Sequence, residues 1–101
     1  MKVFVQSVNF NADQKLVDFV EKKVMGLEKF HDKIVDVDVF LRVQKTSEKE
    51  NKFTELKINI PGSELIVKKE AKTFEEGASM VVDSMKRQLK KSKEKEREFQ
   101  H

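Results

Sequence analysis

The spacing of apolar residues changes along this chain, and the change limits the folds that the chain can adopt. Between positions 35 and 43 every second residue is apolar, and Asp36, Asp38 and Arg42 lie in between. Strict alternation is typical of a strand that buries one face and exposes the other. A second alternating run covers positions 55–60. The sequence therefore predicts a sheet with one solvated face.

Two other segments repeat apolar residues every three or four positions, which is the spacing of an amphipathic helix. The first follows Asn11 and Gln14, which have the form of a capping box with Asn11 as the N-cap, and it ends at Phe30. The second follows another such box, from Thr73 to Glu76. The two stripes are Leu16, Phe19, Val20, Val24 and Leu27, and Phe74, Ala78, Val81, Met85 and Leu89.

The order of elements is strand, helix, three strands and helix. A strand over 2–8 opens the chain, and a return strand over 65–67 follows the turn at Pro61-Gly62. Four strands can bury one face only beneath both helices, which predicts an α+β fold, a two-layer sandwich. With 101 residues and no cysteine, the chain has room for one core, so residues 1–101 are expected to form a single domain. Gly26, inside the first helix, predicts a close contact with a neighbouring element.

Positive charge is concentrated at the end of the chain. Residues 86–101 hold seven Lys and Arg against three Asp and Glu, whereas residues 1–85 hold 14 against 15. On a helix these cations form two rows, and like charges four positions apart destabilise a helix by about 0.2–0.5 kcal/mol per pair. A polyanion would turn this repulsion into attraction, while an ordinary solvated helix end is the alternative. The rows are Lys86, Lys90, Lys93 and Arg97, and Arg87, Lys91 and Lys95.

The first helix carries a basic row of its own. Lys15, Lys22 and Lys29 are spaced by seven residues. Lys23 falls inside the apolar arc, where a lysine either extends past the core to reach water or is kept for a partner. Two helices packed side by side would join these cations into one basic surface.

Three segments together resemble a known family: residues 27–30, residues 57–62 and residues 85–93. They look like the corresponding segments of the short hibernation-promoting factors, bacterial proteins that are also called ribosome-associated inhibitors. The family has the same order of elements, and the resemblance covers essentially the whole chain. The order and spacing of these motifs, rather than any one of them, make the resemblance specific.

The resemblance implies a ribosome hibernation factor of stress and stationary phase. Such a protein binds the rRNA of the small ribosomal subunit between head and body, in the mRNA channel and the A- and P-site tRNA positions. It inhibits translation by occlusion and protects idle ribosomes, without enzymatic activity, cofactor, metal or small-molecule substrate. The candidate rRNA-binding residues are Lys22, Lys23, Lys29, Lys86, Arg87, Lys90, Lys91 and Lys93.

The chain departs from the family pattern at Phe74, where the family often has a tyrosine. We expect a monomer when free and a chain end, residues 94–101, that frays. We also expect the chain to lack the second domain with which long members pair ribosomes, so that pairing would need another factor.

Two alternatives remain open. A double-stranded RNA-binding module is suggested by the lysine-rich residues 68–72, although that module begins with a helix and has a histidine in a loop where residues 45–52 have none. An acylphosphatase-like hydrolase would need an early arginine, and the first one here is Arg42. The two histidines, His31 and His101, suggest neither a catalytic base network nor a metal site.

The aromatic and apolar content narrows the function further. The chain has no Trp or Tyr, and of its eight Phe we expect Phe10, Phe53 and Phe99 to be exposed and at least five to pack in the core. No apolar stretch reaches the length of a membrane span, and no signal-peptide pattern is present, so a cytoplasmic protein is expected. Polar residues after Leu89 disfavour a coiled coil.

Overall fold

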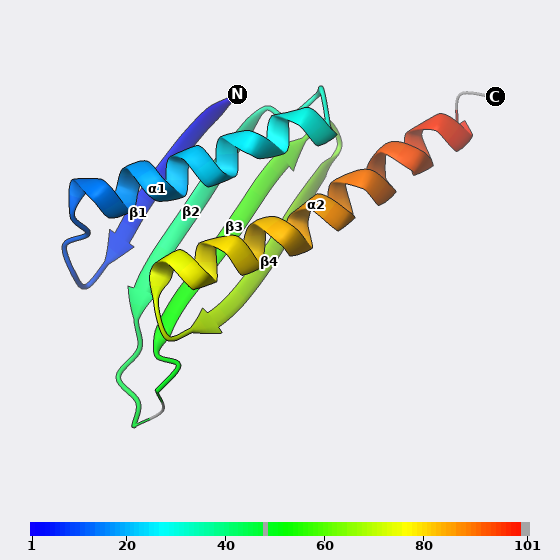
Figure 1. The fold of residues 1–101 in the computed structure, drawn as a ribbon. Helices are drawn as coiled ribbons and strands as arrows, with labels where there is room; N and C mark the ends of the chain where they lie inside the picture. Colours follow the sequence, from blue (N-terminus) through cyan, green and yellow to red (C-terminus); the bar gives the residue numbers. More distant parts are fainter. Residues whose placement is uncertain (48, 100–101) are drawn as a thin grey trace.

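A four-stranded sheet with both helices on one of its faces forms the architecture of this computed structural model, as Figure 1 shows. The structure describes residues 1–47 and 49–99. This architecture confirms the predicted α+β sandwich. Its elements are β1 (Lys2–Val8), α1 (Gln14–Met25), the 3-10 helix η1 (Gly26–Phe30), β2 (Asp36–Val43), β3 (Lys52–Ile60), β4 (Ser63–Ala71) and α2 (Phe74–Phe99).

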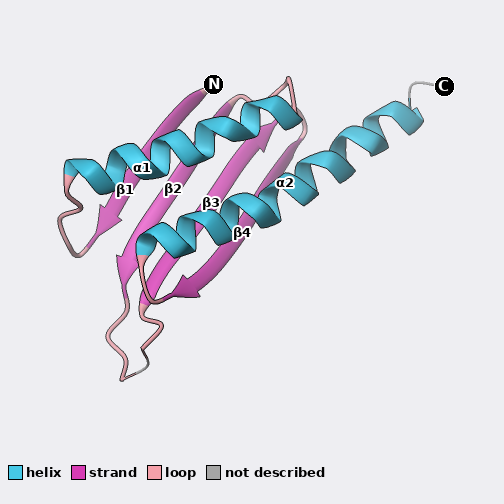
Figure 2. Ribbon diagram, in the orientation of Figure 1, coloured by secondary structure: helices cyan, strands magenta, loops and turns pink. Residues whose placement is uncertain are grey.

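The strands lie in the order of the sequence, β1-β2-β3-β4. β1 is parallel to β2, with α1 as the crossover, and the other two pairs are antiparallel. The sheet is therefore mixed. One register row runs across all four strands through Val5, Val39, Leu56 and Val67. Val39, Leu56 and Val67 are buried and Val5 packs against the core, so this row lies on the covered face. Figure 2 shows both helices on that face and none on the other, the open face.

The alternation in β2 predicts the core correctly at its centre. Val37, Val39 and Leu41 are fully buried. Val35, which the pattern also assigns to this face, precedes the strand and is 57% exposed. The core is completed by the buried residues Val20, Val24, Leu27, Leu56, Ile58, Val81, Met85 and Leu89.

Helix α1 begins two residues later than the Asn11 capping box predicts. Asp13 is the N-cap, and its Oδ1 accepts a hydrogen bond of 2.8 Å from the backbone N–H of Leu16. The side chain of Gln14 bonds to Asp18 instead of turning back to the cap. A carboxylate caps as well as an amide and also meets the positive end of the helix dipole. At α2 the predicted cap is correct, because the Oγ1 of Thr73 accepts a hydrogen bond from the N–H of Glu76.

The close contact predicted at Gly26 lies at Gly77 instead. A β-carbon on Gly26 would meet no atom within 4 Å among the residues described. A β-carbon on Gly77 would lie 2.6 Å from the Oγ1 of Thr54, a buried residue of β3. Gly77 therefore sets how closely α2 approaches the sheet.

The phenylalanines divide differently from the prediction. Phe10 is half-buried, and its ring stacks on that of Phe74 at 4.9 Å between centres. Phe53 is also half-buried, whereas Phe4 on the open face is 48% exposed. The side chain of Phe99 lies outside the described part of the chain. The prediction failed because alternation does not tell which face of a strand is covered when both faces carry apolar residues.

The last strand and the last helix are longer than their apolar patterns. β4 continues to Ala71, so the lysine-rich segment of 68–71 is strand. The backbone of α2 continues to Phe99, and its last turns extend past the sheet (Figure 1). Of the expected frayed end, residues 100 and 101 lie outside the described residues.

Candidate nucleic-acid interface

The ring of Phe30, at the end of η1, is where the first helix meets α2. Phe30 packs partly against the core. The Nζ of Lys86 lies 4.7 Å from the centre of its ring, and the Nζ of Lys90 lies 5.3 Å from it. Both distances are within the range of cation–π attraction. Two ammonium groups of α2 are therefore held over one aromatic ring that the first half of the chain supplies.

A hollow opens beside this ring. It is lined by Phe30, Lys90, Lys93 and Glu94. Lys90 is exposed, while Lys86 and Lys93 are half-buried along their stems. Long lysine stems cover apolar surface and leave the charged ends in water.

A second lysine and ring pair lies on α1. Lys23 is exposed, and its Nζ lies 5.9 Å from the centre of the Phe19 ring, which packs against the core. Phe19 and Lys23 line a second hollow with Lys22 and Gly26. Of the two roles considered for Lys23, the structure shows the side chain running over an apolar ring to water. We call the five lysines around these two rings, together with Lys29 next to Phe30 in sequence, the basic helical surface; its members are Lys22, Lys23, Lys29, Lys86, Lys90 and Lys93.

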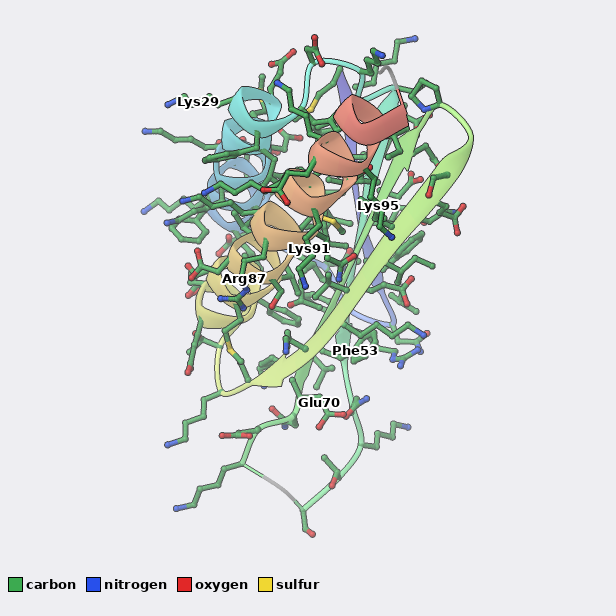
Figure 3. All side chains as sticks on the ribbon, turned by 90° about the vertical axis from the view of Figure 1, so that its right-hand side faces the viewer. Lys29, Phe53, Glu70, Arg87, Lys91 and Lys95 are labelled. Carbon is green, nitrogen blue, oxygen red and sulfur yellow. The ribbon has the colours of Figure 1, made fainter. Side chains whose placement is uncertain are left out.

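The outer row of α2 lies on a different flank. Figure 3 shows Arg87, Lys91 and Lys95 along the side of α2 that faces the β4 edge, whereas Lys29 points away from the sheet. Arg87 contacts Ser84 through Nη2 and Oγ at 3.4 Å. The single continuous surface that the sequence suggests is thus two surfaces, the basic helical surface and the outer row. The side chain of Arg97 lies outside the described residues.

The eight candidate cations of both surfaces form no ion pairs within residues 1–47 and 49–95, the part of the chain whose side chains the structure describes, although Glu94 lines the hollow beside Lys90 and Lys93. Glu28, next to Lys29 in sequence, pairs with the amino group of Met1 at 3.6 Å. Close cations without counterions repel one another, and an external anion relieves that repulsion.

The open face of the sheet has the opposite character. Lys57 pairs with Glu64 at 3.4 Å, and Lys68 pairs with Glu55 at 3.6 Å. Asn59 donates a hydrogen bond to Asp36 across two strands. Two lysines of this face are thus neutralised within the face, whereas none of the six lysines of the basic helical surface forms an ion pair in the part of the chain that the structure describes.

Phe19 and Phe30 are the residues that analysis of the sequence missed. Both lie on the apolar stripe and are read there as core. Lys23 follows Phe19 by four residues, a spacing that brings two side chains together on a helix, so the sequence contained a signal for the Phe19–Lys23 pair. The second pair joins η1 to α2 and has no signal in the sequence, since it depends on how the two helices pack.

The double-stranded RNA-binding alternative disagrees with the architecture. A double-stranded RNA-binding module would need a helix at residues 68–72, and residues 68–71 belong to β4. The chain also begins with a strand, whereas that module begins with a helix. His31 lies in the loop after η1, where it is buried, and its Nδ1 accepts a hydrogen bond from the N–H of Lys33. No helix of the described chain is long and apolar enough to cross a membrane.

A mixed four-stranded sheet, with the basic helical surface on one side and two lysine–glutamate ion pairs on the other, defines a small α+β protein. Residues 3–97 match the family described as Sigma 54 modulation protein / S30EA ribosomal protein. The chain belongs to this family, the family of the ribosome hibernation factors.

Named relatives agree with this assignment. The chain is 32% identical over 96 residues to the ribosome hibernation promoting factor of Pseudomonas putida, covering 95% of this chain and 90% of the relative. It is 30% identical over 100 residues to the factor of the same name from Azotobacter vinelandii, covering 99% and 90%.

Two solved structures share the fold. A ribosomal subunit interface protein from Coxiella burnetii superposes with a TM-score of 0.77 at 19% identity, covering 92% of this chain and 98% of the other. The N-terminal domain of Thermus thermophilus Protein Y gives 0.73 at 22% identity, covering 89% and 93%. At these identities the likeness concerns the fold.

Proposed function

We propose that this protein binds the rRNA of the small ribosomal subunit and inhibits translation by occlusion. It occupies the mRNA channel and the A- and P-site tRNA positions, between head and body. There it silences and protects idle ribosomes in stress and stationary phase, as a non-enzymatic cytoplasmic protein that is a monomer when free. The family assignment supports ribosome binding, and residues 1–101 act as one ribosome-binding domain.

The lysines over Phe19 and Phe30 are the observation that carries this proposal. Cations fixed on rigid helices gain affinity for RNA by releasing its counterions, and they need no base sequence for this. The rings restrict the lysine side chains before binding, so less freedom is lost when a phosphate arrives. Folded rRNA, recognised by shape and phosphates, fits such a surface.

The eight candidate residues take two roles in this proposal. The basic helical surface, with Lys22, Lys23, Lys29, Lys86, Lys90 and Lys93, contacts one stretch of rRNA phosphates. Arg87 and Lys91, on the outer row, contact phosphates on the other flank of α2. With cations on both flanks of α2, the protein fits into a channel that is lined by phosphates on two sides.

Co-sedimentation with purified small subunits tests the proposal. The test variant is Lys86→Gln, Lys90→Gln and Lys93→Gln combined. The matched control is Lys2→Gln, Lys57→Gln and Lys68→Gln combined, which removes the same charge from β1 and the open face. We expect the test variant to bind about tenfold or more weakly and to lose inhibition of cell-free translation, while the control keeps both.

Equal loss in the two variants would contradict the proposal, because it would mean that only net charge matters. Binding of the wild-type protein to plain duplex RNA as tight as to the small subunit would contradict it as well. Circular dichroism melting curves of both variants should stay close to the wild type, since each cation–π contact or surface ion pair that is lost contributes about 1 kcal/mol or less.

A further inference from the structure

Arg42 differs from the lysines of the open face that form ion pairs. It lies opposite Phe53 in the β2–β3 register, and its guanidinium carbon lies 4.6 Å from the centre of the Phe53 ring. Lys57 and Lys68 on the same face have carboxylate partners. Arg42 is exposed, and within the described residues it has no ion-pair partner. The Phe53 ring therefore holds the guanidinium in place, and its positive charge remains available to bind an anion.

A hollow with a second cation opens beside Arg42. Besides Arg42 it is lined by Asn9, Val43, Gln44, Lys45 and Thr46. The lining holds a guanidinium, an ammonium and two side-chain amides, all of which donate hydrogen bonds, and it contains no carboxylate. Asn9 has a φ of 63°, and no other non-glycine residue of the described chain has a positive φ. Asn tolerates this conformation better than most residues.

We propose that this hollow binds an RNA phosphate and thereby gives the protein a second RNA contact. The inference rests on the proposed function, because it adds a contact to the same ribosome complex. A guanidinium offers a planar fork of N–H groups that matches two phosphate oxygens. The cation–π contact with Phe53 helps hold the guanidinium in position, and Lys45 adds a second positive charge on the neighbouring loop.

The hollow lies far from the basic helical surface. Figure 1 shows the β2–β3 loop at one end of the sheet, while η1 and the later turns of α2 lie at the other end. A phosphate bound at Arg42 therefore belongs to a different stretch of RNA from one bound at Lys86. Contacts at both ends would fix the orientation of the protein on the ribosome. With contacts at the basic helical surface alone, the protein could still rotate about that surface.

The test is ribosome binding by the full chain with Arg42→Gln and Lys45→Gln combined. We expect affinity for small subunits to fall about threefold to tenfold, and the slope of log affinity against log salt to become shallower by about one to two units. Arg42→Lys keeps the charge but loses the planar fork of N–H groups. Its affinity for small subunits should lie between that of the double variant and that of the wild type. The matched control, Lys57→Gln with Lys68→Gln, should bind like the wild type.

Unchanged affinity and salt slope in the Arg42 and Lys45 variant would overturn the inference and leave the proposed function intact. Loss of binding by this variant but not by the Lys86, Lys90 and Lys93 variant would instead contradict the rRNA contact proposed for the basic helical surface. If Arg42→Gln lowers the melting temperature, Lys45→Gln alone decides the matter, since its side chain lies exposed in the loop.

Nuclear magnetic resonance distinguishes RNA phosphate from free phosphate. A short single-stranded RNA should shift the Arg42 Nε–H signal and the side-chain amide signals of Asn9 and Gln44 in a saturable way. Inorganic phosphate at the same phosphate concentration should shift them less. Equal shifts from both would mean a site for small anions and would contradict the RNA assignment.

Discussion

The Nζ of Lys86 on α2 lies 4.7 Å from the centre of the Phe30 ring on η1. This contact joins the two halves of the helical layer at the surface that we propose meets RNA. A cation–π pair near the surface contributes about 1 kcal/mol, too little to hold the fold together. Its effect is to fix where the ammonium groups of Lys86 and Lys90 lie before binding.

Replacing Phe30 by Leu tests this ordering effect. Leu keeps most of the packing against the core but cannot attract the two ammonium groups, so stability should fall by less than about 1.5 kcal/mol. Affinity for small subunits should fall about twofold to fivefold, because the lysines lose their fixed positions. The salt slope should not change, since no charge is removed. Sedimentation over a salt series measures both, and a changed slope would contradict this account.

Gly77→Ala should destabilise the fold by about 1–3 kcal/mol, because the added carbon would press on the buried Oγ1 of Thr54. Gly26→Ala is the matched control. It meets open space, so it should leave stability unchanged or raise it by up to about 1 kcal/mol. Urea unfolding of both variants measures the difference. Equal stability of the two would show that α2 is not in close contact with β3.

Thr54→Val should stabilise the protein by about 1 kcal/mol. The hydroxyl of Thr54 is buried and has no hydrogen-bond partner within the described residues, and a buried polar group without a partner costs about 1–3 kcal/mol. Valine has nearly the same shape and no polar group to leave unsatisfied. Thr54→Ser, which keeps the hydroxyl, should show no gain. A lower midpoint of urea unfolding for the valine variant would contradict this explanation.

Asp13→Ala should cost about 0.5–2 kcal/mol, the usual loss at an N-cap. Asn11→Ala should cost much less, because the side chain that caps α1 is that of Asp13. Thermal unfolding of the two variants in parallel measures the difference. A larger loss of stability in Asn11→Ala than in Asp13→Ala would mean that Asn11 is the N-cap, as the capping box predicts.

The sequence contains enough information for the order of elements and the centre of the core. Val37, Val39 and Leu41 alternate because one strand face is covered, and that local pattern needs no knowledge of partners. The sequence determines the ends of helices and strands less well. Asn11 and Asp13 are both good caps, and only the path of the chain from β1 into α1 selects between them.

The candidate site also has a part that the sequence predicts and a part that it does not. Helical spacing predicts the row of Lys86, Lys90 and Lys93, because spacing along one helix is a local property. The contact of Lys86 with Phe30 depends on how η1 packs against α2, and no periodicity reveals it. The separation of Arg87 and Lys91 onto the other flank follows from which side of α2 faces α1, which also requires the packed structure.

The salt dependence of small-subunit binding tests the central claim most directly. For the wild type and for the combined Lys86→Gln, Lys90→Gln and Lys93→Gln variant, the slope of log affinity against log salt counts released counterions. The slope should become shallower by about two to three units in the variant, and by less than about one in the Lys2→Gln, Lys57→Gln and Lys68→Gln control. An unchanged slope in the variant would mean that these three lysines do not contact phosphates.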